Sequence, residues 1–156
     1  MLLDQIFDKY ADRLPEPPKP KGVYKPMIVT GNMAFVSGHG PVNPPGSDNE
    51  LICGRIGIAV SQEYGKDAAL QTGLAILATL RAHLGSLSKV KRVIKVLGMV
   101  NADADFENHP YVINGCSELF EEVWGNENGV GSRSAVGFGS LPQNITVEIE
   151  AQFELY

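Results

Sequence analysis

The chain has 156 residues, which is the usual size of one domain. Its 44% hydrophobic and 20% charged residues are typical of a globular protein with a core of its own. Thirteen lysines and arginines against eighteen aspartates and glutamates give a net charge of −5. This charge argues against a broad nucleic-acid surface, because such a surface needs clustered cations to neutralise phosphates.

The cysteines and the N-terminus indicate the cellular compartment. Cys53 and Cys116 lie in apolar segments without the spacing of a disulfide framework or a zinc site, and we interpret them as buried thiols in a reducing compartment. No segment approaches the roughly 18 apolar residues of a membrane span. Asp4 and Asp8 interrupt the N-terminus, and no basic leader precedes an apolar block. We therefore expect a cytoplasmic protein without a signal peptide.

The first 20 residues form a segment of their own. Apolar residues recur at helical spacing from Leu3 to Leu14 and predict a short amphipathic helix packed on the body. Four prolines between Pro15 and Pro20 end this helix and predict an extended linker. A spacer is favoured over a PxxP ligand. The main domain is expected to span residues 21–156.

Strands and helices are mixed through that domain. The predicted elements are a hairpin at 27–36, a loop at 40–46, a strand at 52–56, a helix at 61–84, a strand at 90–100, a helix from about 108, a flexible segment at 125–131, a strand at 133–138, a turn at 141–144 and a strand at 145–155. Ser61 and Gly85 fit the start and end of the first long helix, and Pro110 is tolerated in the first turn of the second. Strict alternation makes the last strand the clearest.

This order lacks regular βαβ alternation and predicts an α+β fold. We expect a mostly antiparallel sheet with both long helices on one face. The other face is then left with polar and small side chains, including Glu148, Glu150 and Gly137. A bare sheet face in a small protein meets water, a ligand or another subunit.

Several kinds of site are not expected. The glycines lack a following Lys-Ser/Thr pair, so no phosphate-binding loop is predicted. His39, His83 and His109 are not paired at i, i+4 and do not adjoin a cysteine, which argues against a metal site. His83 fits the C-terminal end of a helix, and His109 is expected to be solvated. His39 lies in the small-residue bend 37–40, where the backbone can approach a ligand.

Arg133 is the most informative charged residue. It opens a predicted strand after a glycine-rich loop, among small and apolar neighbours. A guanidinium in that place needs a partner, because an unpaired buried charge is costly. Spacing leaves two hypotheses open: an ion pair with Glu148 or Glu150 on a neighbouring strand, or a bidentate fork for a small carboxylate ligand.

Six segments form an ordered set along the chain. They are Gly22–Tyr24, Thr30–Gly38, Val112–Asn114, Arg133–Gly137, Leu141–Pro142 and Val147–Ala151. Together they resemble the signature of the RidA/YjgF family, which also carries the names endoribonuclease L-PSP and translation initiation inhibitor. The resemblance covers about residues 20–156.

The resemblance implies a chorismate-mutase-like α+β fold of the bacillus type in a homotrimer, with ligand clefts between subunits. Active members of this family hydrolyse reactive enamines and imines, such as 2-aminoacrylate, to 2-keto acids and ammonia. They need no metal or organic cofactor. The partners implied are a small carboxylate substrate and two further copies of the chain, with neither a membrane nor a nucleic acid.

The resemblance also assigns roles to individual residues. Arg133 matches the arginine that holds the substrate carboxylate, and Glu148 matches the acidic residue that positions water or a proton. Asn114 is either a cleft residue or a structural tie. The substrate-binding set implied is Tyr24, Ser37, His39, Asn114 and Ala135.

The chain departs from the family pattern in places. Ala135 stands where cysteine is common, and His39 stands where glutamine is common. Gly131 and Ser132 replace the usual run before the arginine and loosen that loop. The N-terminal extension and extra residues around 103–107 indicate a longer branch of the family.

Three functional hypotheses are compatible with these observations. The leading hypothesis is an enamine/imine deaminase that depends on Arg133. The second is a non-catalytic or chaperone-like trimer that binds a small carboxylate in the same cleft. An endoribonuclease is the weakest, because of the net charge of −5 and the lack of a histidine pair. Chorismate mutase activity is disfavoured because few cations are available for a dicarboxylate.

Overall fold

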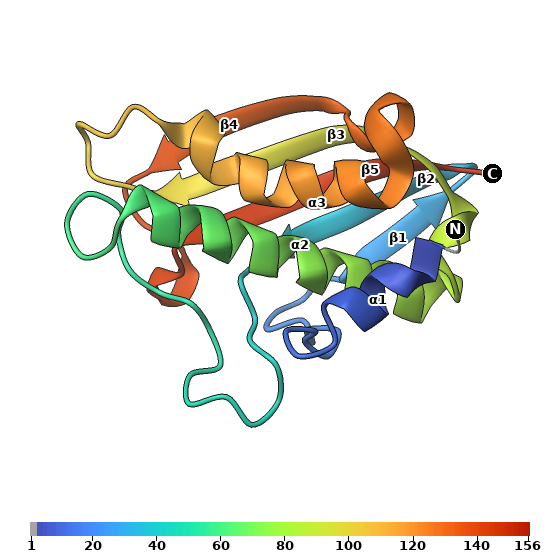
Figure 1. Ribbon diagram of the computed structural model, residues 1–156, viewed down its shortest axis with the longest axis horizontal. Helices are drawn as coiled ribbons and strands as arrows, with labels where there is room; N and C mark the ends of the chain where they lie inside the picture. Colours follow the sequence, from blue (N-terminus) through green and yellow to red (C-terminus); the bar gives the residue numbers. More distant parts are fainter. Residues whose placement is uncertain (1–2) are drawn as a thin grey trace.

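Five strands form one sheet, and two long helices cover one of its faces, as seen in the computed structural model, which describes residues 3–156 (Figure 1). The strands are β1 (Met27–Thr30), β2 (Met33–His39), β3 (Val90–Asn101), β4 (Ser132–Phe138) and β5 (Val147–Leu155). Their spatial order is β1-β2-β5-β3-β4, and all neighbours are antiparallel except β3 and β4, which are parallel. The expected α+β class is confirmed.

The helices begin and end where their capping residues allow. They are the short α1 (Ile6–Lys9) and the long α2 (Gln62–Leu84) and α3 (His109–Gly129). The Ser61 hydroxyl accepts the Tyr64 N–H at 3.1 Å, and Gly85 ends α2 with a φ of 89°. None of the helices within residues 3–156 has the length and apolar character that a membrane crossing requires.

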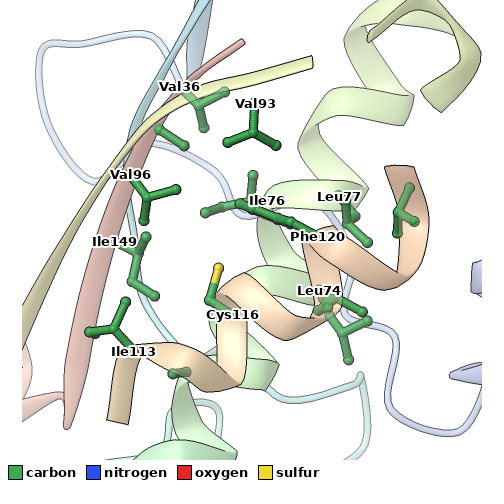
Figure 2. Packing of buried hydrophobic residues seen from close by; sticks show 14 of the residues in the cluster. Val36, Leu74, Ile76, Leu77, Val93, Val96, Ile113, Cys116, Phe120 and Ile149 are labelled. Atoms are coloured by element: carbon green, nitrogen blue, oxygen red, sulfur yellow. The ribbon is translucent and has the colours of Figure 1, made fainter. Parts of the chain in front are cut away.

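The hydrophobic core lies between the two long helices and the sheet face that they cover (Figure 2). Apolar side chains of α2, α3 and the three central strands meet there: Val36, Leu74, Ile76, Leu77, Val93, Val96, Ile113, Cys116, Phe120 and Ile149. All ten are buried. Most of the apolar surface removed from water is therefore on the helix side of the sheet.

Two local expectations are wrong, and a third, the N-terminal helix, is met only in part. Residues 52–56 form only isolated bridges rather than a strand, because Gly54 and Gly57 adopt φ values of 125° and 92° that break an extended run. The segment 125–131 is not simply a flexible loop, since α3 bends at Gly125 and continues to Gly129. The predicted N-terminal helix is a 3-10 turn followed by the four residues of α1.

Tertiary contacts fasten that N-terminal segment to the long helices. Ile6 and Phe7 are buried, and the Arg13 guanidinium makes a bidentate ion pair with Asp67 at 2.9 and 3.1 Å. Packing on the body thus replaces the helical turns that periodicity predicted. Residues 1 and 2 of the predicted N-terminal segment lie outside the described residues.

The other face of the sheet is open in the single chain. It carries Glu148 and Glu150, as expected, together with the exposed apolar residues Ile28, Phe35 and Val136. Gly137 was expected on this face and lies on the other. It pairs with the buried Val100 of β3, and a Cβ built on it would meet the ring of His109 on α3.

Candidate active site

Arg133 is held by neutral acceptors on α3. Its Nη1 donates to Asn114 Oδ1 at 2.7 Å and to Ser117 Oγ at 3.2 Å, and Nη2 lies 3.5 Å from the Pro110 carbonyl. Nε makes no hydrogen bond within residues 3–156. These contacts orient the guanidinium and leave the Nε proton and one of the two Nη2 protons for a further acceptor.

The positive charge of Arg133 is not neutralised inside the described part of the chain. The ion pairs there join other residues, and none brings a carboxylate within 4 Å of this guanidinium. The hypothesis of an ion pair with Glu148 or Glu150 is therefore wrong for the single chain. A hollow of about 360 Å³ opens beside the arginine, with Glu118 and Glu121 on its rim.

Arg133 and Glu148 lie on opposite faces of the sheet. Arg133 pairs with Val96, whose side chain is in the core, so both point toward the helices. Glu148 pairs with Met99 on the open side. The two proposed site residues cannot meet within one chain, because the backbone of the sheet lies between its two faces. The chain thus carries two half-sites, one around Arg133 and one around Glu148.

The Glu148 half-site is a cavity of about 160 Å³. Its walls include Pro18–Lys21 of the proline-rich segment, Tyr24, Gly38 and Gln143. Glu148 is partly buried, and burial raises the pKa of its carboxyl, with a smaller contribution from the negative charge of Glu150. The raised pKa makes this carboxylate a better proton acceptor than an ordinary surface glutamate.

Gly38 lets the carboxylate lie directly against β2. A Cβ at this position would be 2.6 Å from Glu148 Oε2 and 3.0 Å from its carboxyl carbon, closer than side chains tolerate. Glycine is therefore required for the observed placement of Glu148. The Tyr24 hydroxyl, at the same cavity, accepts the Lys21 N–H at 3.3 Å, and the side chain is half exposed.

Both ring nitrogens of His39 lie within hydrogen-bond distance of other protein atoms. Its Nε2 lies 2.8 Å from the Thr79 hydroxyl on α2, and Nδ1 lies 2.6 Å from the Ser37 carbonyl. Burial lowers the pKa of this ring, which is 4% exposed. The ring ties β2 to α2, so a contact of His39 with ligand through the backbone of the bend stays a prediction. Ser37 donates to the Lys25 carbonyl at 2.6 Å.

Ala135 completes the Arg133 half-site. It pairs with Gly98 of β3 and lies on the same side of β4 as the arginine. Asn114 belongs to this half-site through its contact with Arg133, whereas Tyr24 and Ser37 lie on the Glu148 side. The seven predicted residues are therefore divided between two places rather than brought together.

Two features of these half-sites escaped the sequence analysis. Ser117 follows Asn114 by three residues on α3, and this helical spacing is a signal that could have found it. Gln143 and the next residue, Asn144, adopt φ values of 55° and 58°, a left-handed turn that shapes the rim of the Glu148 cavity. Within residues 3–156, no cluster of three or more His, Cys, Asp or Glu side chains is arranged to hold a metal ion.

These features define a class: an α+β protein with a half-covered sheet, an arginine without an ion-pair partner on one side and a partly buried glutamate on the other. A family model described as endoribonuclease L-PSP matches residues 15–154. The chain is 35% identical to protein TCP17 of Trypanosoma cruzi over 143 residues, covering 92% of this chain and 88% of that protein.

Two further comparisons agree with this match. A solved structure of a protein of unknown function from Agrobacterium tumefaciens is 35% identical, covers 99% of this chain and 92% of that chain, and superposes with a TM-score of 0.85. A 2-iminobutanoate/2-iminopropanoate deaminase of Dermatophagoides farinae is 28% identical over 137 residues, covering 88% of this chain and 89% of that protein. The chain belongs to the endoribonuclease L-PSP family, which is the RidA/YjgF family of the resemblance.

Proposed function

We propose that this protein hydrolyses reactive enamines and imines of the 2-aminoacrylate type to 2-keto acids and ammonia. The observation that carries the proposal is the Arg133 guanidinium, which neutral groups hold in place and which has no carboxylate partner in the described chain. A planar fork of this kind matches a substrate carboxylate and fixes the adjacent imine carbon. The name of the Dermatophagoides farinae relative supports the same reaction class.

The two half-sites favour catalysis in a cleft shared between copies of the chain. Since Arg133 and Glu148 lie on opposite sides of one sheet, a second copy has to supply one of them. The open face carries exposed Ile28, Phe35 and Val136, an apolar surface that another copy can cover. We propose a homotrimer, in which each copy gives its arginine side to one neighbour and its glutamate side to the other.

In this cleft Arg133 orients the substrate and Glu148 moves a proton. The Glu148 carboxylate takes a proton from water as the water oxygen bonds to the imine carbon. It returns that proton to nitrogen, which gives the carbinolamine, and then carries the hydroxyl proton to the same nitrogen as the carbon–nitrogen bond breaks and ammonia leaves. Imine and water thus give keto acid and ammonia. Catalysis rests on orientation and electrostatics, without a covalent enzyme intermediate.

The test measures keto-acid release from an enamine generated in the assay by a serine or threonine dehydratase. We expect the wild type to accelerate release above the spontaneous rate, and Arg133→Ala to reduce kcat/KM by about 10²-fold or more. Arg133→Lys keeps the positive charge but loses the planar guanidinium, so its kcat/KM should lie between those of the wild type and Arg133→Ala. A folded wild type without acceleration would contradict the proposal and favour a binding role, visible as thermal stabilisation by small carboxylates.

Mixing variants tests the shared cleft. Arg133→Ala and Glu148→Gln are each expected to be inactive alone. After co-refolding in equal amounts, random pairing restores both groups in about a quarter of the clefts, with a matching recovery of activity. No recovery from mixed trimers, or a monomer by light scattering, would contradict a site shared between copies.

A further inference from the structure

His109 stands at the end of α3 that contacts Arg133 through Pro110, and it is partly exposed, where the sequence predicted a solvated residue. It is the first residue of α3, and its ring stands over Gly137 of β4. A Cβ on Gly137 would be 2.5 Å from His109 Nε2, so the ring occupies the space that a side chain there would need. Phe106 contacts the same ring edge-on, with centroids 5.1 Å apart. Packing thus fixes the ring position.

The ring nitrogens of His109 remain available. Neither has a hydrogen-bond partner among residues 3–156, and the side chain is partly exposed. His39, in contrast, has both ring nitrogens within hydrogen-bond distance of protein atoms. A histidine that is positioned by packing and free at its nitrogens can exchange protons with a ligand.

His109 and Arg133 face the same strip of β4. Residues 133, 135 and 137 pair with helix-facing residues of β3 and alternate on one side of the strand. The Arg133 fork reaches the Pro110 carbonyl with Nη2, and Pro110 follows His109 directly. The guanidinium therefore lies against the first turn of α3, the turn that also carries the imidazole. Ala135, the residue of β4 between positions 133 and 137 on that side, has a small side chain.

We propose that His109 is a second catalytic residue of this site, acting on the nitrogen of the substrate whose carboxylate Arg133 holds. The proposal rests on the deaminase function proposed above. The imidazolium of His109 gives a proton to the imine nitrogen, which makes the carbon more electrophilic for the water that Glu148 activates. The imidazole takes back a proton from the hydroxyl of the carbinolamine as the carbon–nitrogen bond breaks. Both residues return to their starting protonation states, and the sum remains imine plus water to keto acid plus ammonia.

The experiment compares His109→Gln and His109→Ala with His83→Gln, a matched change on α2 whose histidine Nδ1 lies 2.9 Å from the Thr79 carbonyl of its own helix. We expect both His109 variants to lose about 10²-fold or more in kcat with little change in KM, because carboxylate binding by Arg133 is kept. His83→Gln should retain wild-type turnover. Added imidazole should restore part of the activity to His109→Ala and none to Arg133→Ala.

Gly137→Ala is an independent probe of the same contact. Its Cβ must displace the ring of His109, so kcat should fall in the wild-type background. In the His109→Ala background the same change should have almost no further effect, since the obstructed ring is gone. This non-additivity separates a role of the imidazole from a general disturbance of β4.

Each outcome decides the proposal. If Arg133→Ala is inactive while His109→Gln retains turnover within about threefold of wild type, the role of His109 is wrong and the proposed deaminase stands. Additive losses from Gly137→Ala and His109→Ala would also overturn it. A wild type without turnover overturns both proposals together.

Discussion

Gly38→Ala tests the placement of Glu148 without altering any charged group. The new Cβ would lie 2.6 Å from Glu148 Oε2, and ordinary contact begins at 3.4 Å, so the carboxylate has to move by nearly 1 Å. Displacement of a catalytic group by about 1 Å can cost about 10²-fold in rate. We expect a loss of that order in kcat for keto-acid release, since Arg133 on the opposite side of the sheet still binds the substrate.

The matched control is Gly139→Ala, where a Cβ meets nothing within 4 Å and activity should be unchanged. Circular dichroism and light scattering establish that both variants keep the fold and the assembly. Wild-type kcat in a folded Gly38→Ala protein would refute the reasoning, because it would mean that the position of Glu148 does not matter. If Gly139→Ala lost as much activity as Gly38→Ala, the loss could not be assigned to displacement of Glu148.

Two further predictions concern stability. Burial raises the pKa of Glu148, so the folded protein binds a proton on this carboxyl more tightly than the unfolded chain does. This proton binding stabilises the fold at low pH, and the stabilisation is lost as the pH rises through the folded-state pKa. Glu148→Gln should therefore have a higher melting temperature than the wild type at pH 7, while being inactive. The difference in melting temperature should disappear in acid. A variant that melts below the wild type at pH 7 would contradict this. Thr79→Val removes the partner of His39 Nε2 and should lower the free energy of unfolding by about 1–3 kcal/mol, measured by urea titration. An unchanged urea midpoint would mean that water replaces the hydroxyl.

The N-terminal segment contributes to the site in a way that composition did not indicate. Its first part packs on α2 and α3, and its proline-rich part, residues 18–21, forms a wall of the Glu148 cavity. Prolines suit this wall because they already restrict the backbone of the unfolded chain, so less conformational entropy is lost when the segment is ordered. The segment thus runs from the long helices, which cover one face of the sheet, to the open face.

Local signals in the sequence determined most of the secondary structure. The strict alternation from Val147 to Leu155 identified β5, because one face is buried and the other is polar. Ser61 and Gly85 marked the ends of α2, since capping depends on a few adjacent residues. The segment 52–56 failed because its strand propensity is overridden by two glycines with positive φ. The arginine and the glutamate of the proposed site came from the ordered family segments.

Only the tertiary structure decided on which side of the sheet each site residue lies. A shift of one residue in register moves every side chain of a strand to the other face. No residue of β4 is fully buried, and its sequence carries no alternation that reveals its register. The parallel pairing with β3 sends Arg133 and Gly137 toward α3, away from Glu148. The partner of His39 is 40 residues away, and the ring of His109 meets Gly137 across two elements. These contacts depend on how distant segments pack, which no local pattern records.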